Sequence, residues 1–205
     1  MPPRELRYLL GDVRTATARY LRGGDDSFDG FFDLASLLLN VTVMSEMGGV
    51  RLVAGESGVK YLAGWRGIQD PLPLTDGRYL RLIMALYLEK TDKGRLLKVD
   101  EASAQYQADR EGKRWIFRYD YRRHPKDRYA AGHVQINGTL TETGASMSRI
   151  HFPTGRVSLE AILRLLIEDF GVPPREPAEN WRAVLAESET EFLRIAHQAP
   201  SGPAA

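Results

Sequence analysis

The feature that most constrains the fold is a change in the spacing of apolar residues along the chain. Before Gly48 and again after Ser158, apolar side chains recur every three to four positions, which is the repeat of an amphipathic helix. Between Val50 and Phe152 they recur every two positions, in short runs separated by Gly, Pro and Asp, which is typical of antiparallel strands. The sequence therefore predicts an α+β fold, with an antiparallel meander of six to seven strands packed on one face by N-terminal and C-terminal helices.

The individual helices and strands follow from this spacing and from the residues that end each run. Helices are expected within residues 1–20, over 28–41 and 159–170, and from 180 onward. The stretch 64–77, with two prolines and three glycines, is expected to be a surface loop. One domain is expected over 1–198, followed by a disordered tail at 199–205. The predicted strands are 50–53, 59–62, 79–88, 96–107, 114–122, 133–140 and 148–152.

Composition narrows the classes of chemistry. The 205-residue chain has no cysteine, which excludes disulfides, thiolate catalysis and cysteine-ligated metal sites. Its net charge of +1 gives no global field that favours nucleic acid or a membrane surface. No apolar run approaches the roughly 20 residues that span a bilayer, and the first residues lack the apolar region of a secretory signal. We therefore expect a soluble, cytoplasmic protein without a membrane partner.

Three consecutive predicted strands place unlike side chains on their two faces. In 114–122, the residues Trp115, Phe117, Tyr119 and Tyr121 alternate and so share one side. This aromatic row is expected to pack against the terminal helices, and a base-stacking platform for RNA is the alternative. If neighbouring strands align their apolar faces, the opposite face collects six polar residues: Arg118, Asp120, His133, Gln135, Arg149 and His151.

These residue types suit cleavage of a phosphodiester without a metal or other cofactor. His133 and His151 are the candidate acid and base, and Asp120 is the candidate residue that orients a histidine. Two other interpretations stay open: solvated charges with cross-strand ion pairs, and a metal site on the two histidines and Asp120. The candidate substrate-binding residues are Arg118, Arg149, Gln135, Arg122 and Arg156.

The local charge of one segment favours a polyanionic partner more strongly than the net charge of the whole chain does. Residues 109–128 hold eight basic and four acidic side chains, a net charge of +4, while the rest of the chain carries −3. Residues 109–113 are expected to form a hairpin loop in which Gly112 adopts positive φ. A second candidate anion site is the turn of Thr154, Gly155 and Arg156 before a predicted helix, although a plain strand-to-helix turn explains it equally well.

Short patterns in the C-terminal half resemble a known family. The succession FRYDY at 117–121, GHVQI at 132–136 and IHFPTGRVSLE at 150–160 resembles the TumE-like toxin components of bacterial toxin–antitoxin pairs and other uncharacterised bacterial small proteins. The chain departs from the family pattern at HVQ, where an HxH pattern is expected. The resemblance implies a small intracellular effector of toxin or phage-defence type that acts on nucleic acid.

Two functions from different classes follow from these observations. The first is a metal-independent, RNase-like effector that acts on RNA or another single-stranded nucleic acid. The second is a non-catalytic binding or assembly module that holds a partner protein or nucleic acid on the sheet face, or on the last helix with Trp181 and Phe192. An acid–base histidine pair predicts a bell-shaped rate profile, whereas binding through arginines weakens mainly with salt.

Overall fold

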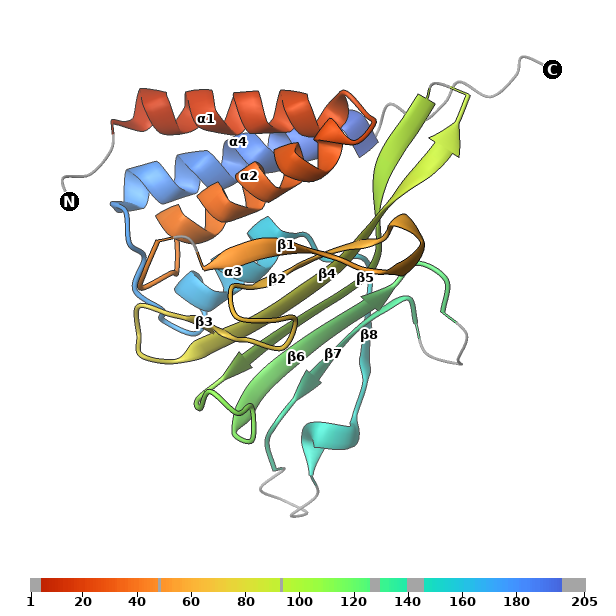
Figure 1. Ribbon diagram of the computed structural model, residues 1–205. Coiled ribbons are helices and arrows are strands. Elements are labelled where there is room, and N and C mark those ends of the chain that lie inside the picture. Colours follow the sequence, from red (N-terminus) through yellow and green to blue (C-terminus); the bar gives the residue numbers. More distant parts are fainter. Residues whose placement is uncertain (1–4, 48, 93, 126–129, 140–145, 197–205) are drawn as a thin grey trace.

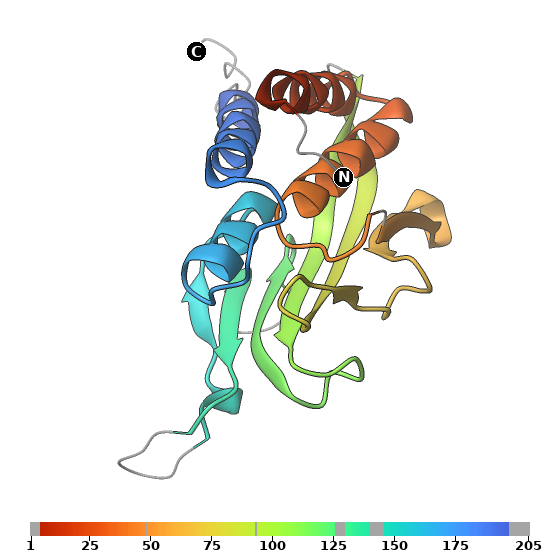
Figure 2. The ribbon, with the colours of Figure 1, turned by 90° about the vertical axis from the view of Figure 1, so that its left-hand side faces the viewer.

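The described part of the chain is a layer of helices on one face of an antiparallel sheet (Figures 1 and 2). The computed structural model describes residues 5–47, 49–92, 94–125, 130–139 and 146–196, with side chains described as far as Glu191. These residues include four α-helices and eight strands. The expected α+β class, with helices from the two ends of the chain on the sheet, is therefore confirmed. The predicted tail at 199–205 lies outside the described residues.

The two N-terminal helices, α1 (Leu6–Leu21) and α2 (Asp26–Val41), form an antiparallel pair. On α1 the residues Leu9, Val13 and Ala16, at spacings of three and four, are buried. The turn between the helices contains Gly23 and Gly24, whose φ angles of 80° and 74° favour glycine. Gly24 N–H donates to the carbonyl of Arg95 at 2.9 Å, which ties this turn to the far end of a long strand pair.

The two C-terminal helices complete the layer. Helix α3 (Leu159–Glu168) begins as predicted behind Ser158, whose hydroxyl accepts a hydrogen bond from Ala161 N–H at 3.2 Å. It ends before Gly171, which has a φ of 68°. Helix α4 (Ala178–Ala196) buries Trp181 to 1% exposure. No helix in the described ranges combines the length and the apolar character needed to cross a bilayer.

The sheet is antiparallel throughout, in the order β1-β2-β4-β5-β6-β7-β8, with the short strand β3 paired to β4. The long β4–β5 pair extends past the other strands towards the α1–α2 turn (Figure 1). The strands are β1 (Val50–Ala54), β2 (Lys60–Gly64), β3 (Leu72–Pro73), β4 (Tyr79–Thr91), β5 (Gly94–Gln107), β6 (Trp115–Arg122), β7 (Gly132–Ile136) and β8 (Phe152–Thr154).

Three predicted segments differ from the structure. The expected surface loop at 64–77 contains β3, and its Leu72 and Leu74 are core residues at 1% and 2% exposure. The strand predicted at 133–140 ends at Ile136, and Leu140 lies outside the described residues. The strand predicted at 148–152 is wrong: residues Met147–Arg149 form the 3-10 helix η2, and β8 begins only at Phe152.

The core lies between the sheet and the helices, and the aromatic row of β6 belongs to it. Phe117 and Tyr119 are 3% and 2% exposed, and the Phe117 ring stacks on Phe170 with centroids 5.2 Å apart. The Tyr119 hydroxyl accepts a hydrogen bond from Val157 N–H at 2.9 Å. Core packing is therefore confirmed, and the alternative of a base-stacking platform is wrong because the two middle rings are covered.

Candidate functional site

The strand register brings most of the predicted polar residues together on the face opposite the helices. Arg118 pairs with Gln135, and Asp120 pairs with His133, so all four side chains project to the same side. On the other flank of β6, Gln105 and Ser103 of β5 face Arg118 and Asp120. The alternation that predicted this shared face is confirmed for β6 and β7.

This face carries an open groove of about 720 Å³, named here the polar groove. It is shaped by β4, β5, β6 and β7, by Tyr61 of β2, and by the loop residues Ile68 and Gln69. Its polar side chains are Gln69, Arg81, Glu101, Ser103, Arg118, Asp120, Arg122, His133 and His151.

Hydrogen bonds join the centre of the polar groove into one network. Arg118 Nε donates to Asp120 Oδ2 at 2.7 Å, and another guanidinium nitrogen of Arg118 donates to Gln135 Oε1 at 2.5 Å. Gln135 Nε2 lies 3.1 Å from His151 Nε2 and 3.2 Å from the Ser148 carbonyl. Because the Gln135 oxygen faces Arg118, its amide nitrogen must donate to His151 Nε2, which is therefore unprotonated at that atom.

The two histidines are in direct contact. Their ring centroids lie 4.6 Å apart, and His133 Nε2 lies 3.7 Å from Asp120 Oδ2. Burial lowers the pKa of His133; the Asp120 carboxylate opposes this, and charges on His151 and Arg118 lower the pKa further. Two imidazoles this close resist carrying two positive charges at once, because a charge on His151 disfavours a charge on His133.

Arg81 and Gln105 extend this hydrogen-bond network. Neither was among the site residues predicted from the sequence. Arg81 donates to Gln105 Oε1 at 2.9 Å, and Gln105 Nε2 donates to Gln107 Oε1 at 2.8 Å. The buried Arg81 Nε has no hydrogen-bond partner among the described residues. Burial lowers the pKa of Arg81 and the charge of Arg118 lowers it further, yet a guanidinium stays protonated. Two like charges thus face one groove, an arrangement that a bound anion stabilises.

Three predicted substrate-binding arginines lie elsewhere or are already paired. Arg149 sits on η2, is exposed, and is not among the described residues that line the polar groove, so its predicted place beside His151 on a strand is wrong. Arg156 is on the helix side of the sheet, with its guanidinium 5.7 Å from the Tyr121 ring centroid. Arg122 lines the groove but pairs with Glu101 at 3.0 Å.

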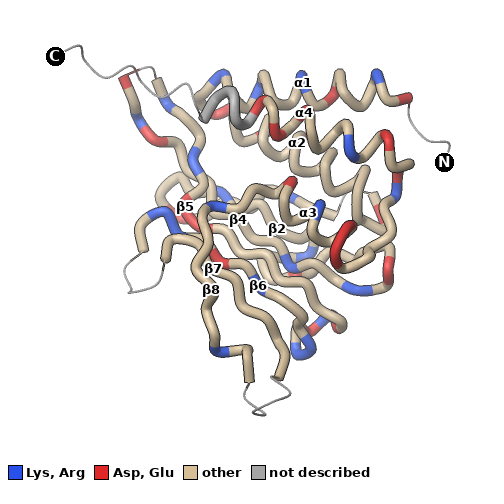
Figure 3. Tube along the Cα trace, turned by 180° about the vertical axis from the view of Figure 1, so that it is seen from behind, with Lys and Arg blue, Asp and Glu red and all other residues tan. Residues whose placement is uncertain are grey.

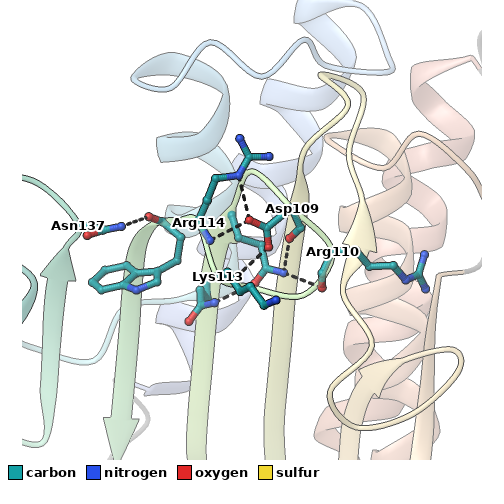
Figure 4. A network of polar contacts seen from close by, with 8 residues as sticks. Asp109, Arg110, Lys113, Arg114 and Asn137 are labelled. Carbon is teal, nitrogen blue, oxygen red and sulfur yellow. Dashed lines mark hydrogen bonds and ion pairs between the residues drawn. The ribbon is translucent and has the colours of Figure 1, made fainter.

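Four arginines of the basic segment at 109–128 are paired with carboxylates: Arg110, Arg114, Arg118 and Arg122. Figure 4 shows Asp109 at the centre of the hairpin loop, where its carboxylate accepts from the Lys113 and Arg114 backbone N–H groups at 2.9 and 2.8 Å. Burial alone raises the pKa of the Asp109 carboxyl, but these hydrogen bonds outweigh it and lower the pKa. Arg110 pairs with Asp70, and Gly112 has the expected positive φ of 74°. Figure 3 accordingly shows acidic segments interspersed with basic ones along the chain.

A wider groove of about 960 Å³ lies between α1, α2 and residues 174–178, but it contains none of the chain's described histidines. Within the described ranges, no three His, Asp or Glu side chains are grouped so that they could hold a metal ion. The metal-site interpretation of His133, His151 and Asp120 therefore gains no support. The contacting histidines make the polar groove the better candidate for chemistry.

Comparison with protein-family models, curated proteins and solved structures finds no match to this chain.

Proposed function

We propose that the polar groove is the active site of a metal-independent ribonuclease. The observation that carries the proposal is the contact between His133 and His151, whose ring centroids lie 4.6 Å apart beside Asp120, in the same groove as Arg81 and Arg118. A pair with one neutral and one protonated imidazole contains a base and an acid side by side, which is what cleavage by an internal hydroxyl requires.

The hydrogen bonds support a division of roles between the two histidines. His151 accepts from Gln135 at Nε2 in the resting site, so it is the base; the attacking 2′-hydroxyl of a ribose takes the place of the Gln135 amide and gives its proton to Nε2. His133 is the acid: the Asp120 carboxylate favours its protonated form, and in that form it gives its proton to the leaving 5′-oxygen. The P–O5′ bond breaks as the 2′-oxygen bonds to phosphorus, leaving a 2′,3′-cyclic phosphate and a 5′-hydroxyl. Arg81 and Arg118 bind the phosphate oxygens.

Binding without turnover is the second candidate, and one observation favours it. Arg118 already donates to both Asp120 and Gln135, so the groove at rest is a closed polar network. A module that only holds an anionic partner on this face needs no proton transfer. The version of this candidate that uses the last helix is weakened, because Trp181 is 1% exposed and therefore offers no surface to a partner.

Cleavage of labelled single-stranded RNA in EDTA tests the proposal. Wild-type protein is expected to cut RNA but not DNA of the same sequence, which lacks the 2′-hydroxyl. Replacing His133 or His151 by alanine is expected to lower the rate by roughly 100-fold or more, with a bell-shaped pH profile for the wild type. His124→Ala, at an exposed position outside the groove, is the matched control.

The outcomes separate the candidates. Cleavage by the His133→Ala/His151→Ala double variant would contradict the assignment of these histidines as acid and base. Salt-sensitive retention of RNA without cleavage supports the binding module. If neither occurs, nucleic acid is not the substrate, and a protein partner becomes the next target.

The proposed biological setting is a toxin or phage-defence effector, and it rests on the resemblance of residues 117–121, 132–136 and 150–160 alone. Expression in bacteria is then expected to arrest growth with the wild type but not with the double histidine variant. Equal growth in both cultures would contradict the role as a toxin or defence effector. The proposed ribonuclease activity would still be tested by the cleavage assay.

A further inference from the structure

A second cavity lies on the other side of the sheet from the polar groove. It has a volume of about 130 Å³, is partly open to solvent, and is lined by residues of α1, α2, α4, the strands β4, β5 and β6, and by residues 156–160. Most of its lining is apolar and includes Phe31, Leu38, Met84, Val99 and Tyr119. An apolar cavity of about 150 Å³ is known to accept a benzene ring in another protein, so this volume suits a single ring or a short branched chain.

Three buried polar side chains line the same cavity. Thr17 is 3% exposed, and its hydroxyl has no hydrogen-bond partner among the described residues. Two residues earlier on the same helix, Thr15 donates to the Gly11 carbonyl at 2.9 Å, so the geometry of α1 does not prevent such a bond. A buried hydroxyl without a partner is costly unless something else satisfies it. Thr17 thus marks the cavity as a place for a polar group.

Glu160 supplies a negative charge, and Ser188 donates a hydrogen bond to it. Glu160 is 6% exposed, Ser188 is 2% exposed, and the Ser188 hydroxyl donates to Glu160 Oε1 at 2.5 Å. The described residues form no ion pair with Glu160. A carboxylate taken out of water is stabilised by a counter-charge. Arg156 also lines the cavity but is exposed, so the buried charge of the cavity is negative.

We propose that this cavity binds a small apolar amine, whose ring or branched chain fills the apolar part and whose ammonium group pairs with Glu160. The Thr17 hydroxyl accepts one of the ammonium hydrogens, and Ser188 holds the carboxylate in place. This site is independent of the proposed ribonuclease chemistry, because none of the three polar residues lines the polar groove.

Binding of four single-ring probes to the full chain tests the proposal: benzylamine, benzyl alcohol, benzoate and toluene. Calorimetric titration is expected to show benzylamine as the tightest, and thermal unfolding to show the largest rise in Tm with it. Glu160→Gln keeps an oxygen for Ser188 and removes the charge. It is expected to weaken benzylamine by roughly 10- to 100-fold while benzyl alcohol changes little. Glu168→Gln, at the exposed end of α3, is the matched control.

Two further variants keep the test decisive if Glu160→Gln folds poorly. Thr17→Val keeps the side-chain shape and removes the hydroxyl, so it is expected to weaken benzylamine and not toluene. Ala35→Leu fills the cavity and is expected to abolish binding of all four probes. Benzoate binding as tightly as benzylamine, unchanged affinity in the Glu160 and Thr17 variants, or no binding of any probe would overturn the proposal.

Discussion

The side chain of Tyr106 is 0% exposed, and its hydroxyl sits between two charged groups. It donates to Asp76 Oδ2 at 2.6 Å and accepts from Arg78 at 2.7 Å. Burial, followed by the hydrogen bond to Asp76, raises the pKa of Tyr106 from 10.0 to about 12. The folded protein therefore holds this proton at a pH where the unfolded chain has lost it.

Stability is expected to fall between about pH 10 and pH 12 because of this tyrosine. Above pH 10 the unfolded state binds fewer protons than the folded state, so the free energy of unfolding decreases with pH, by on the order of 2 kcal/mol at pH 12 from this group. Urea unfolding at pH 8, 10 and 11.5 measures it. Tyr106→Phe is expected to show a shallower decrease than wild type, whereas Tyr8→Phe, at a 57% exposed position, keeps the wild-type slope. Parallel slopes in all three proteins would contradict the role of Tyr106.

At this scale the sequence predicted the centre of the polar groove but not its edges. Arg118, Asp120, His133, Gln135 and His151 could be grouped because alternation fixes which face each side chain takes. Arg149 was misplaced because the Ser146 hydroxyl accepts from Ser148 N–H and caps a 3-10 turn in place of a strand.

Arg81 was missed for a different reason. Alternation within a strand does not reveal which residues of two strands face each other, and the register that sets Arg81 opposite Gln105 is known only from the fold. A signal was present, since Gln105 and Gln107 are polar residues that alternate with the buried Ala104 and Tyr106.

At the scale of elements, the packing of α2 on α1 depends on Gly30. A Cβ at this buried position would lie 2.3 Å from the Tyr20 nitrogen and 2.7 Å from the Arg19 carbonyl carbon, both backbone atoms of α1. Gly30→Ala is expected to lower the free energy of unfolding. Overpacking against backbone costs about 1 to 3 kcal/mol, and the better helix propensity of alanine offsets only up to about 1 kcal/mol.

Gly11→Ala is the matched control on the partner helix. Gly11 is exposed, and a Cβ there would meet nothing within 4 Å, so alanine is expected to raise stability by about 0.5 to 1 kcal/mol. Denaturant unfolding followed by circular dichroism measures both variants. Opposite signs support close backbone packing of the two helices, and a stabilised Gly30→Ala would show that α2 does not approach α1 as described.

The elements themselves were predictable wherever one periodicity persists. The spacing of apolar residues correctly predicted the helices α1 and α3 and the strand β6. It did so because each of these elements buries one face. The two short elements β3 and η2 were not predicted. Leu72–Pro73 is too brief to show a period, and it is held both by pairing with β4 and by hydrogen bonds from Ser45, 28 residues away, to the Pro73 carbonyl. Contacts distant in sequence decide such segments.

At the scale of the whole molecule, the sheet separates stability from the proposed chemistry. The same strand β6 sends Phe117 and Tyr119 into the core and Arg118 and Asp120 into the polar groove. The groove residues on these strands are half-buried and hydrogen-bonded to one another, and they add little apolar packing to the stability of the fold. Functional groups held in this way commonly reduce stability in exchange for reactivity. Stability and the proposed chemistry conflict at His133, because burial disfavours the protonated form that the proposed acid needs.

His133 is therefore expected to make the folded protein less stable in acid. Its pKa lies below the ordinary 6.5 when folded, so as the pH falls below about 6.5 the unfolded state binds a proton that the folded state does not, and stability decreases. His133→Leu removes this titration. From pH 7.5 to pH 5, its free energy of unfolding is expected to fall less than that of wild type, while RNA cleavage is lost. His124→Leu, at an exposed position, should keep both the wild-type slope and the activity. A His133→Leu protein with the full acid slope would show that the folded state accommodates a charged His133, and the balance between burial and Asp120 would then favour the charge.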